Sequence, residues 1–192
     1  MLFGREEDEM NKDRLCLEIK EAEESQLTFL VTQFSPGNPM FQHNRYATQK
    51  RGEGLYLIAW HHNTPVGHFL LRWSGPNDEP VTKIVDITHS AFLEAGLTVY
   101  EYRRQGVATA IIQEAERLAK ENGCTCIGLE VGINNPEAKR LYDKLGYVDW
   151  GHGDFVISWE QIDENGSKGI GTEVVIYMQK SLINKREPIA QY

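Results

Sequence analysis

The chain has 192 residues, of which 41% are hydrophobic and 25% charged, a balance that suits one globular domain rather than a disordered or fibrous protein. Its formal charge of −8, from 28 acidic and 20 basic side chains, argues against nucleic acid as the main partner. Three cysteines are too few for a disulfide framework, and neither a signal peptide nor an apolar run of roughly 18 residues is apparent. We therefore expect a cytoplasmic protein that binds no metal and no membrane.

The first third of the chain is predicted to contain a strand, two helical segments and a β-hairpin. Alternating apolar residues predict the strand near 15–19, and apolar residues spaced by three and four predict a helix over 21–34. Residues 40–52 are interpreted as a short helix or an ordered loop. Two apolar runs, 55–60 and 66–73, flank turn-forming residues and predict the hairpin.

The rest of the chain alternates strands with helices. Within the segment 74–90, which begins as a loop, residues 81–87 are interpreted as an extension of a strand. The remaining predicted elements are a strand over 91–99, an amphipathic helix that stops at Asn122-Gly123, a strand over 125–131, a helix over 137–145, and strands over 154–160 and 172–179 joined by a loop at 163–171.

This order predicts an α+β (mixed α/β) fold with helices on both faces of one sheet. We expect a single domain over 14–182, between a flexible N-terminal segment at 1–13 and a C-terminal tail at 183–192.

An arginine-rich turn, Arg103-Arg104-Gln105-Gly106-Val107-Ala108, connects the strand at 91–99 to the next helix. Its small residues leave room for the backbone N–H groups of Gln105 to Thr109 to face one anion. A helix N-terminus has unpaired donors and a partial positive charge, and arginines fork onto phosphate oxygens. We interpret the turn as a pyrophosphate site; an ordinary turn with two solvated arginines is the alternative that these residues alone leave open.

This turn resembles, in full, the cofactor motif Gln/Arg-x-x-Gly-x-Gly/Ala of the GCN5-related N-acetyltransferase (GNAT) superfamily. A second family element, Asn-x-x-Ala followed by Leu-Tyr-x-x-x-Gly-Phe/Tyr, is matched by Asn135-Pro136-Glu137-Ala138 and by Leu141-Tyr142-Asp143-Lys144-Leu145-Gly146-Tyr147. The resemblance covers residues 14–182 and implies a mostly antiparallel sheet of six to seven strands, in which two parallel strands splay into a V. Gly96 and Gly128 are suitable places for that bend.

The resemblance also implies acetyl-CoA as the co-substrate and assigns the residues that bind it. Backbone groups of Leu97 and Val99 would pair with the pantetheine arm as an added strand. Asn135 would hydrogen-bond the pantetheine or substrate region. The implied cofactor-binding residues are Leu97, Thr98, Val99, Arg103, Arg104, Gln105, Gly106, Val107, Ala108, Thr109, Asn135, Ala138 and Tyr142.

Acetyl transfer to an amine needs a proton donor for the CoA thiolate and a proton acceptor for the ammonium. By resemblance, Tyr142 is the donor and the Val99 N–H steadies the oxyanion; packing beside its helix neighbours is the alternative role of Tyr142. Glu94 is the candidate base because it lies mid-strand among apolar residues, where alternation places it on one face with Phe92 and Gly96. A strand glutamate that faces the surface is its alternative.

Other acidic residues are interpreted as secondary. Glu130 lies in a predicted strand and is expected to be structural. Glu94, together with Asp86, Glu101 and Asp154, would make an acceptor cleft negative and attract a cationic amine.

The sequence thus favours an acetyl-CoA-dependent N-acetyltransferase, in which a primary amine of a small molecule, peptide or protein attacks directly in a ternary complex. The main alternative is a non-catalytic CoA-binding regulatory module of the same fold. A nucleotide dehydrogenase is disfavoured because the turn lacks Gly-x-Gly-x-x-Gly and lies in mid-chain. The acceptor, the base, a homodimeric state and a preference for longer acyl groups stay open.

Overall fold

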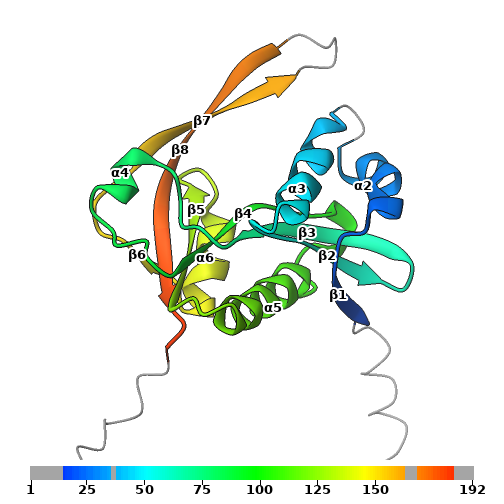
Figure 1. Cartoon of the computed structure of the whole chain (residues 1–192), viewed down its shortest axis with the longest axis horizontal. Helices are drawn as coiled ribbons and strands as arrows, with labels where there is room; N and C mark the ends of the chain where they lie inside the picture. The colour runs from blue at the N-terminus through cyan, green and yellow to red at the C-terminus, as the bar shows by residue number, and fades with distance from the viewer. Residues whose placement is uncertain (1–14, 36–37, 163–167, 184–192) are drawn as a thin grey trace, which may run out of the picture.

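The computed structural model describes residues 15–35, 38–162 and 168–183, and its strands form one eight-stranded sheet (Figure 1). The order along the sheet is β1-β2-β3-β4-β5-β8-β6, and β7 pairs with β8 off this path. β4 and β5 run parallel, and the other pairs are antiparallel. The predicted flexible segments, 1–13 and all but the first residue of 183–192, lie outside the described residues.

The elements have the following bounds in chain order. The N-terminal half contains β1 Leu17–Glu21, η1 Glu24–Gln26, α2 Leu27–Phe34, α3 Met40–Lys50, β2 Gly54–His61, β3 Thr64–Arg72 and α4 Glu79–Thr82. The C-terminal half contains β4 Ser90–Thr98, η2 Tyr100–Tyr102, α5 Val107–Glu121, β5 Cys126–Gly132, α6 Pro136–Leu145, β6 Val148–Asp149, β7 Phe155–Ile162 and β8 Lys168–Ser181.

The mostly antiparallel sheet with one splayed parallel pair is confirmed, with two corrections. The strand expected at 81–87 was wrong, because α4 occupies its start: Pro80 suits the first turn of a helix, and Val81 alone is buried as an apolar anchor. The eighth strand is β6, which has only two residues and therefore no periodicity that a sequence reading could detect.

The splay begins where pairing between β4 and β5 stops, after Leu93 and Leu129. On the other side of β4, the register with β3 shifts, so that Ala95 and Gly96 together oppose Phe69. This β-bulge, in which Ala95 has φ 55°, bends β4 away from β5. The bend expected at Gly96 therefore lies in the bulge, whereas Gly128 instead makes room for the Tyr177 ring.

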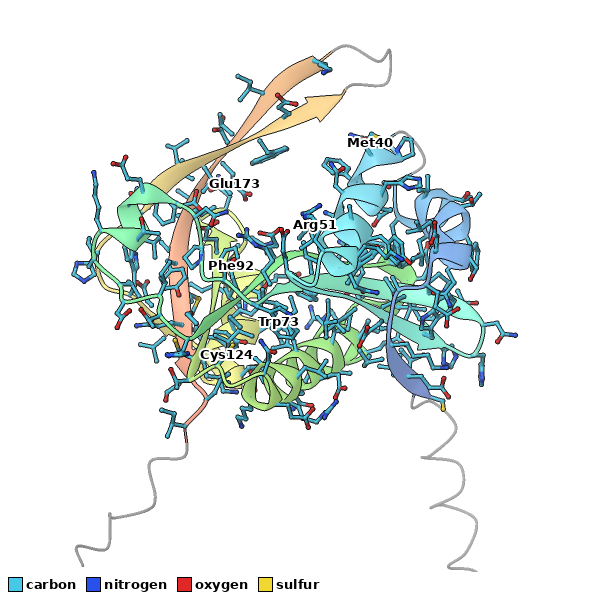
Figure 2. All side chains as sticks on the ribbon, in the orientation of Figure 1. Met40, Arg51, Trp73, Phe92, Cys124 and Glu173 are labelled. Atoms are coloured by element: carbon cyan, nitrogen blue, oxygen red, sulfur yellow. The ribbon has the colours of Figure 1, made fainter. Side chains whose placement is uncertain are left out.

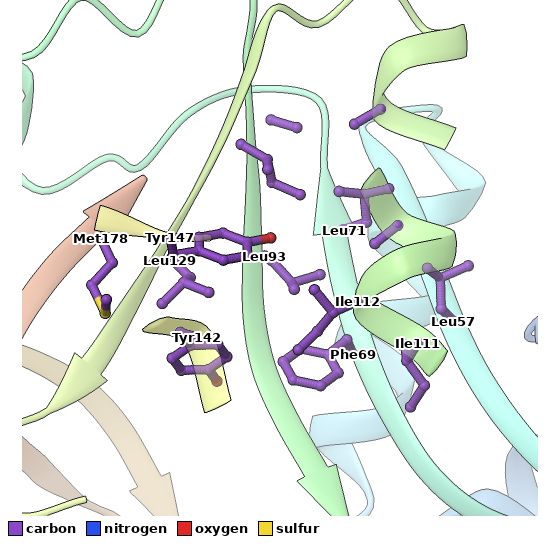
Figure 3. Packing of buried hydrophobic residues seen from close by; sticks show 14 of the residues in the cluster. Leu57, Phe69, Leu71, Leu93, Ile111, Ile112, Leu129, Tyr142, Tyr147 and Met178 are labelled. Carbon is purple, nitrogen blue, oxygen red and sulfur yellow. The ribbon is translucent and has the colours of Figure 1, made fainter. Parts of the chain in front are cut away.

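Helices cover both faces of the sheet (Figure 1). The apolar stripe of α5, including Ile111, Ile112 and Ala115, packs on one face together with Tyr142 and Tyr147 (Figure 3). The opposite face carries a second cluster, in which Leu30 of α2 packs on Tyr56 and Ile58 of β2. Side chains of one strand thus reach opposite faces in alternation, and the site is built from both.

No helix in the described part of the chain is long and apolar enough to cross a bilayer. The same described residues contain no cluster of histidine, cysteine, aspartate or glutamate with the geometry of a metal site.

Candidate active site

The turn Arg103–Thr109, called the diphosphate turn below, presents a run of free backbone donors. Arg103 N–H donates to Tyr100 O at 3.1 Å, and the next amide with a backbone acceptor in this described stretch is Ala110, which donates to Gly106 O at 2.9 Å. The six amides between them are therefore available to a ligand. Two left-handed residues, Arg104 at φ 62° and Gly106 at φ 87°, make this possible by turning the chain sharply into α5.

A pocket of about 670 Å³ opens over the diphosphate turn and the start of α6. Its lining contains the cations Arg103, Arg104, Arg140 and Lys144, with Glu137 as its carboxylate. The Arg103 Nε donates to Thr98 O at 3.3 Å and so braces the turn, whereas the Arg104 side chain is 86% exposed. The pocket therefore combines a positive field with unpaired amides, which is the chemistry that a diphosphate requires.

The edge of β4 that faces the splay differs by one residue from the sequence expectation. The Val99 N–H donates to Val66 O at 2.9 Å, so it is not free to donate to pantetheine or to an oxyanion. Leu97, two residues earlier and opposite His68, likewise directs its backbone N–H and C=O toward β3, because these directions alternate along a strand. Thr98 therefore supplies the backbone groups that face the splay, and the roles expected of Leu97 and Val99 do not fit.

Two predicted residues of α6 lie at the same opening. Asn135 caps the helix, since its Oδ1 accepts from Ala138 N at 3.1 Å, and only its amide donor is left for a ligand. Tyr142 is buried on the inner side of α6 and lies between the diverging strands β4 and β5 in Figure 3. Burial raises the pKa of Tyr142 to about 12, so its phenol keeps its proton at neutral pH.

Glu94 and Glu130 are the first residues of β4 and β5 beyond the last parallel pair, and they flank the splay on the face opposite α5. Arg72 on β3 reaches Glu94 at 3.3 Å. Burial, followed by the negative charge of Asp78, raises the pKa of Glu130 to about 8. The Glu130 Oε1 is buried without a hydrogen-bond partner among the described residues.

The bulge overturns one detail of the expected arrangement. Glu94 shares a face with Phe92, as alternation predicts, but Gly96 does not, because a side chain there would run into Phe69 on the α5 face. The extra residue in β4 reverses the alternation between Glu94 and Gly96.

The acidic surroundings of Glu94 also differ from those expected. Asp86, Glu101 and Asp154 are exposed, and Asp86 accepts from its neighbour Thr88 N at 2.9 Å. The carboxylate of Glu173 on β8, a residue labelled in Figure 2, lies against Gly132, the last residue of β5. Asp78 and Glu130 interact although they are far apart in the chain, and no sequence spacing signals that they meet.

Comparisons with known proteins agree with this geometry. The chain is 37% identical to GCN5-related N-acetyltransferase 4, chloroplastic, of Arabidopsis thaliana over 82 residues. This stretch covers 43% of the chain and 26% of that protein. Over 57 residues it is 35% identical to aminoglycoside N(6')-acetyltransferase type 1 of Acinetobacter baumannii, 30% of this chain and 39% of that protein. The matched stretches therefore span less than half of either relative.

The fold is shared with solved structures of low sequence identity. One is yncA from Salmonella typhimurium, solved with its cofactor acetyl-CoA, which has a TM-score of 0.61 at 13% identity over 91% of this chain and 99% of that one. The profile of the Acetyltransferase (GNAT) family matches residues 18–147, more than half of the chain. The chain thus belongs to the GNAT family of acetyl-transferring enzymes.

Proposed function

We propose that this protein transfers an acetyl group from acetyl-CoA to a primary amine, by direct attack within a ternary complex. The observation that carries the proposal is the run of six unpaired amides from Arg104 to Thr109, which opens beside a splayed parallel pair. Such amides at the start of a 15-residue helix suit a diphosphate, and the splay gives a thioester a passage between the faces of the sheet.

On the cofactor side, the diphosphate turn holds the two phosphates and Thr98 pairs with the pantetheine amides as an added strand would. Asn135 and Ala138 flank the same arm. Gly106 matters here because its left-handed conformation aims the amides at one point. The thioester then lies near the Ala95–Gly96 bulge, between Tyr142 on one face and Glu94 and Glu130 on the other.

On the acceptor side, a carboxylate takes the proton that an ammonium must lose before it can attack. We assign this step to Glu130, whose raised pKa of about 8 lies near the working pH, and we assign to Glu94 the attraction of the cation. The amine nitrogen then bonds to the acetyl carbonyl carbon and the carbon–sulfur bond breaks. Tyr142 donates its phenolic proton to the leaving thiolate and regains a proton as the newly acylated nitrogen loses its second one. The products are an N-acetyl amide, CoA as the thiol, and the one proton that Glu130 took from the ammonium.

Titration calorimetry with acetyl-CoA, paired with a thiol-release assay against a panel of primary amines, tests the proposal. Binding at micromolar ligand together with thiol release supports transfer. Binding without thiol release from any amine favours the non-catalytic CoA-binding module. Absence of binding at millimolar ligand contradicts the assignment of the diphosphate turn.

A further inference from the structure

A second pocket, of about 450 Å³, lies on the acceptor face between helices α2 and α3 and the bulged stretch of β4. We call it the acceptor pocket. Its lining includes Phe34, Asn38, Phe41, Arg45 and His68, together with Ala95 and Gly96 of the bulge. Because Ala95 and Gly96 form the bulge at the splay, a molecule in this pocket is next to the place assigned to the thioester.

Three polar atoms of the lining are buried and have no hydrogen-bond partner among the described residues: Arg45 Nε, His68 Nδ1 and Asn38 Oδ1. His68 is only 2% exposed, and burial lowers its pKa to about 3, so its ring is neutral. Buried polar atoms are normally paired, and unpaired ones in a pocket are the groups that a ligand satisfies. The acceptor pocket thus has polar groups in place for a partner that the chain itself does not supply.

The charge in this pocket is positive, in contrast to the chain as a whole. Arg45 has no ion-pair partner within the described ranges, and its guanidinium lies 5.4 Å from the centre of the Phe41 ring. None of the lining residues is a carboxylate. Glu94 acts on Arg45 only through space, since Glu94 pairs directly with Arg72. A guanidinium held this way forks onto a planar anion such as a carboxylate.

Glu94, assigned above to attract the ammonium, and Glu130, assigned to take its proton, lie beside this pocket and not inside it. A polycation that filled the pocket would place a positive charge against Arg45 and bury it there. A molecule with one ammonium and one carboxylate would pair its carboxylate with Arg45 and its ammonium with the acidic residues beside the pocket. The rings of Phe34 and Phe41 would cover its apolar part.

We propose that the acceptor is a primary amine that also carries a carboxylate, as an amino acid does, with the carboxylate on Arg45 and the amine at the splay beside Glu94 and Glu130. This inference rests on the proposed function and narrows its substrate class.

The test compares matched acceptors with the full chain and acetyl-CoA, in pairs that differ only by the carboxylate: phenylalanine and phenethylamine, leucine and isoamylamine, lysine and cadaverine. We expect a kcat/KM at least 10-fold higher for the carboxylated member of the preferred pair. Arg45→Met should raise the KM for the carboxylated member about 10- to 100-fold. The kcat/KM values of the two members should then be nearly equal. Arg45→Lys, which keeps the charge but loses the fork, should fall between.

Arg51→Met is the matched control, because Arg51 lies just after the same helix with its side chain 55% exposed and paired with Glu53. It should leave the ratio unchanged. A second readout does not need turnover: the N-acetyl derivative of the preferred amino acid should raise the Tm of the wild type and not that of Arg45→Met.

The outcomes separate the two proposals. If amines without a carboxylate are preferred, or if Arg45→Met lowers both members of a pair equally, the inference about the acceptor is wrong while acetyl transfer stands. If acetyl-CoA binds and no amine of either kind releases thiol, the transfer function falls and the acceptor inference falls with it.

Discussion

The cofactor side and the acceptor side of the splay use different chemical groups, backbone amides on the first and side chains on the second. On the cofactor side, the groups that we propose to hold the diphosphate are mainly the backbone amides of consecutive residues, Arg104 to Thr109. On the acceptor side, Arg45, His68, Glu94 and Glu130 contribute side chains from four separate elements. A site made of main chain is encoded by a short motif, whereas a site made of side chains requires the whole topology to bring its parts together.

The largest expected effect is at Tyr142, which stands between the two sides. Tyr142→Phe keeps the ring packing against Tyr147 and removes only the proton donor. We expect kcat to fall about 100-fold, with the Kd for acetyl-CoA unchanged, because a positioned acid contributes on this scale. Stopped-flow thiol release and calorimetry on one preparation measure the two quantities. An unchanged kcat would remove Tyr142 from the mechanism.

The backbone character of the cofactor side is tested by two glycines in the left-handed region at the two ends of α5. A Cβ meets no atom within 4 Å at either Gly106 (φ 87°) or Gly123 (φ 82°), so alanine costs only backbone strain at each position. Gly106→Ala should weaken acetyl-CoA binding about 10-fold. Gly123→Ala should lose similar stability and bind normally. Equal binding by the two variants would show that the turn does not depend on its left-handed geometry.

The pH dependence distinguishes the two acidic residues of the acceptor side. In the wild type, kcat/KM should rise with pH through about 8, as Glu130 loses its proton and becomes a base. Glu130→Gln should lose this rise and keep only the rise that follows deprotonation of the acceptor's own amine. Glu94→Gln should lower kcat/KM without moving the rise at pH 8. A Glu130→Gln profile with the wild-type shape would return the role of base to Glu94.

Glu130 also makes a stability prediction. Its pKa is raised from the ordinary 4.5 to about 8, so the folded chain binds this proton more tightly than the unfolded chain does. The contribution of Glu130 to the free energy of unfolding therefore falls as pH rises from about 4.5 to about 8. Above pH 8, Glu130→Gln should melt a few degrees higher than the wild type, since about 1 kcal/mol corresponds to roughly 2–4 °C in a chain of this size. Scanning calorimetry at pH 5 and pH 9 checks the sign.

The smallest effect is expected from Arg104. Its side chain is 86% exposed and lies 3.8 Å from Glu137, so salt and solvent screen its charge. Arg104→Ala should weaken acetyl-CoA binding by about 2- to 5-fold at low salt and less in 0.5 M NaCl. A loss larger than that of Gly106→Ala would mean that side-chain charge, and not backbone, dominates the cofactor side.

Most of the fold was predictable from the sequence because periodicity and turn residues carry it. The helix after the diphosphate turn was located by its apolar stripe and its stop signal, and the helix over 137–145 by Pro136 at its start and Gly146 at its end. The resemblance implied a bend near Gly96, but the part of Ala95 in it was not predicted, because Ala95 has no sequence signature of a left-handed residue. Two consequences were therefore missed as well: the backbone groups of Thr98 face the splay, and Gly96 lies on the α5 face of the sheet.

The candidate site divides in the same way. The residues of the diphosphate turn and Tyr142 were selected as candidates through local motifs. Glu130 was interpreted as structural because its environment depends on Asp78, which is 52 residues away in a loop without a recognisable motif. Arg45 gave no signal, since a single arginine on a polar helix is ordinary until a buried histidine from β3 is seen beside it.

The Ala95–Gly96 bulge gives this part of the chain an unusual sensitivity to length. One extra residue sets which backbone groups of β4 face the splay. Deleting either Ala95 or Gly96 would therefore shift the register of the residues that follow, up to Thr98, by one position. Substitutions at this point change a side chain, but a one-residue deletion would exchange the inward and outward edges of the strand. We therefore expect this protein to tolerate substitutions at Ala95 far better than insertions or deletions there.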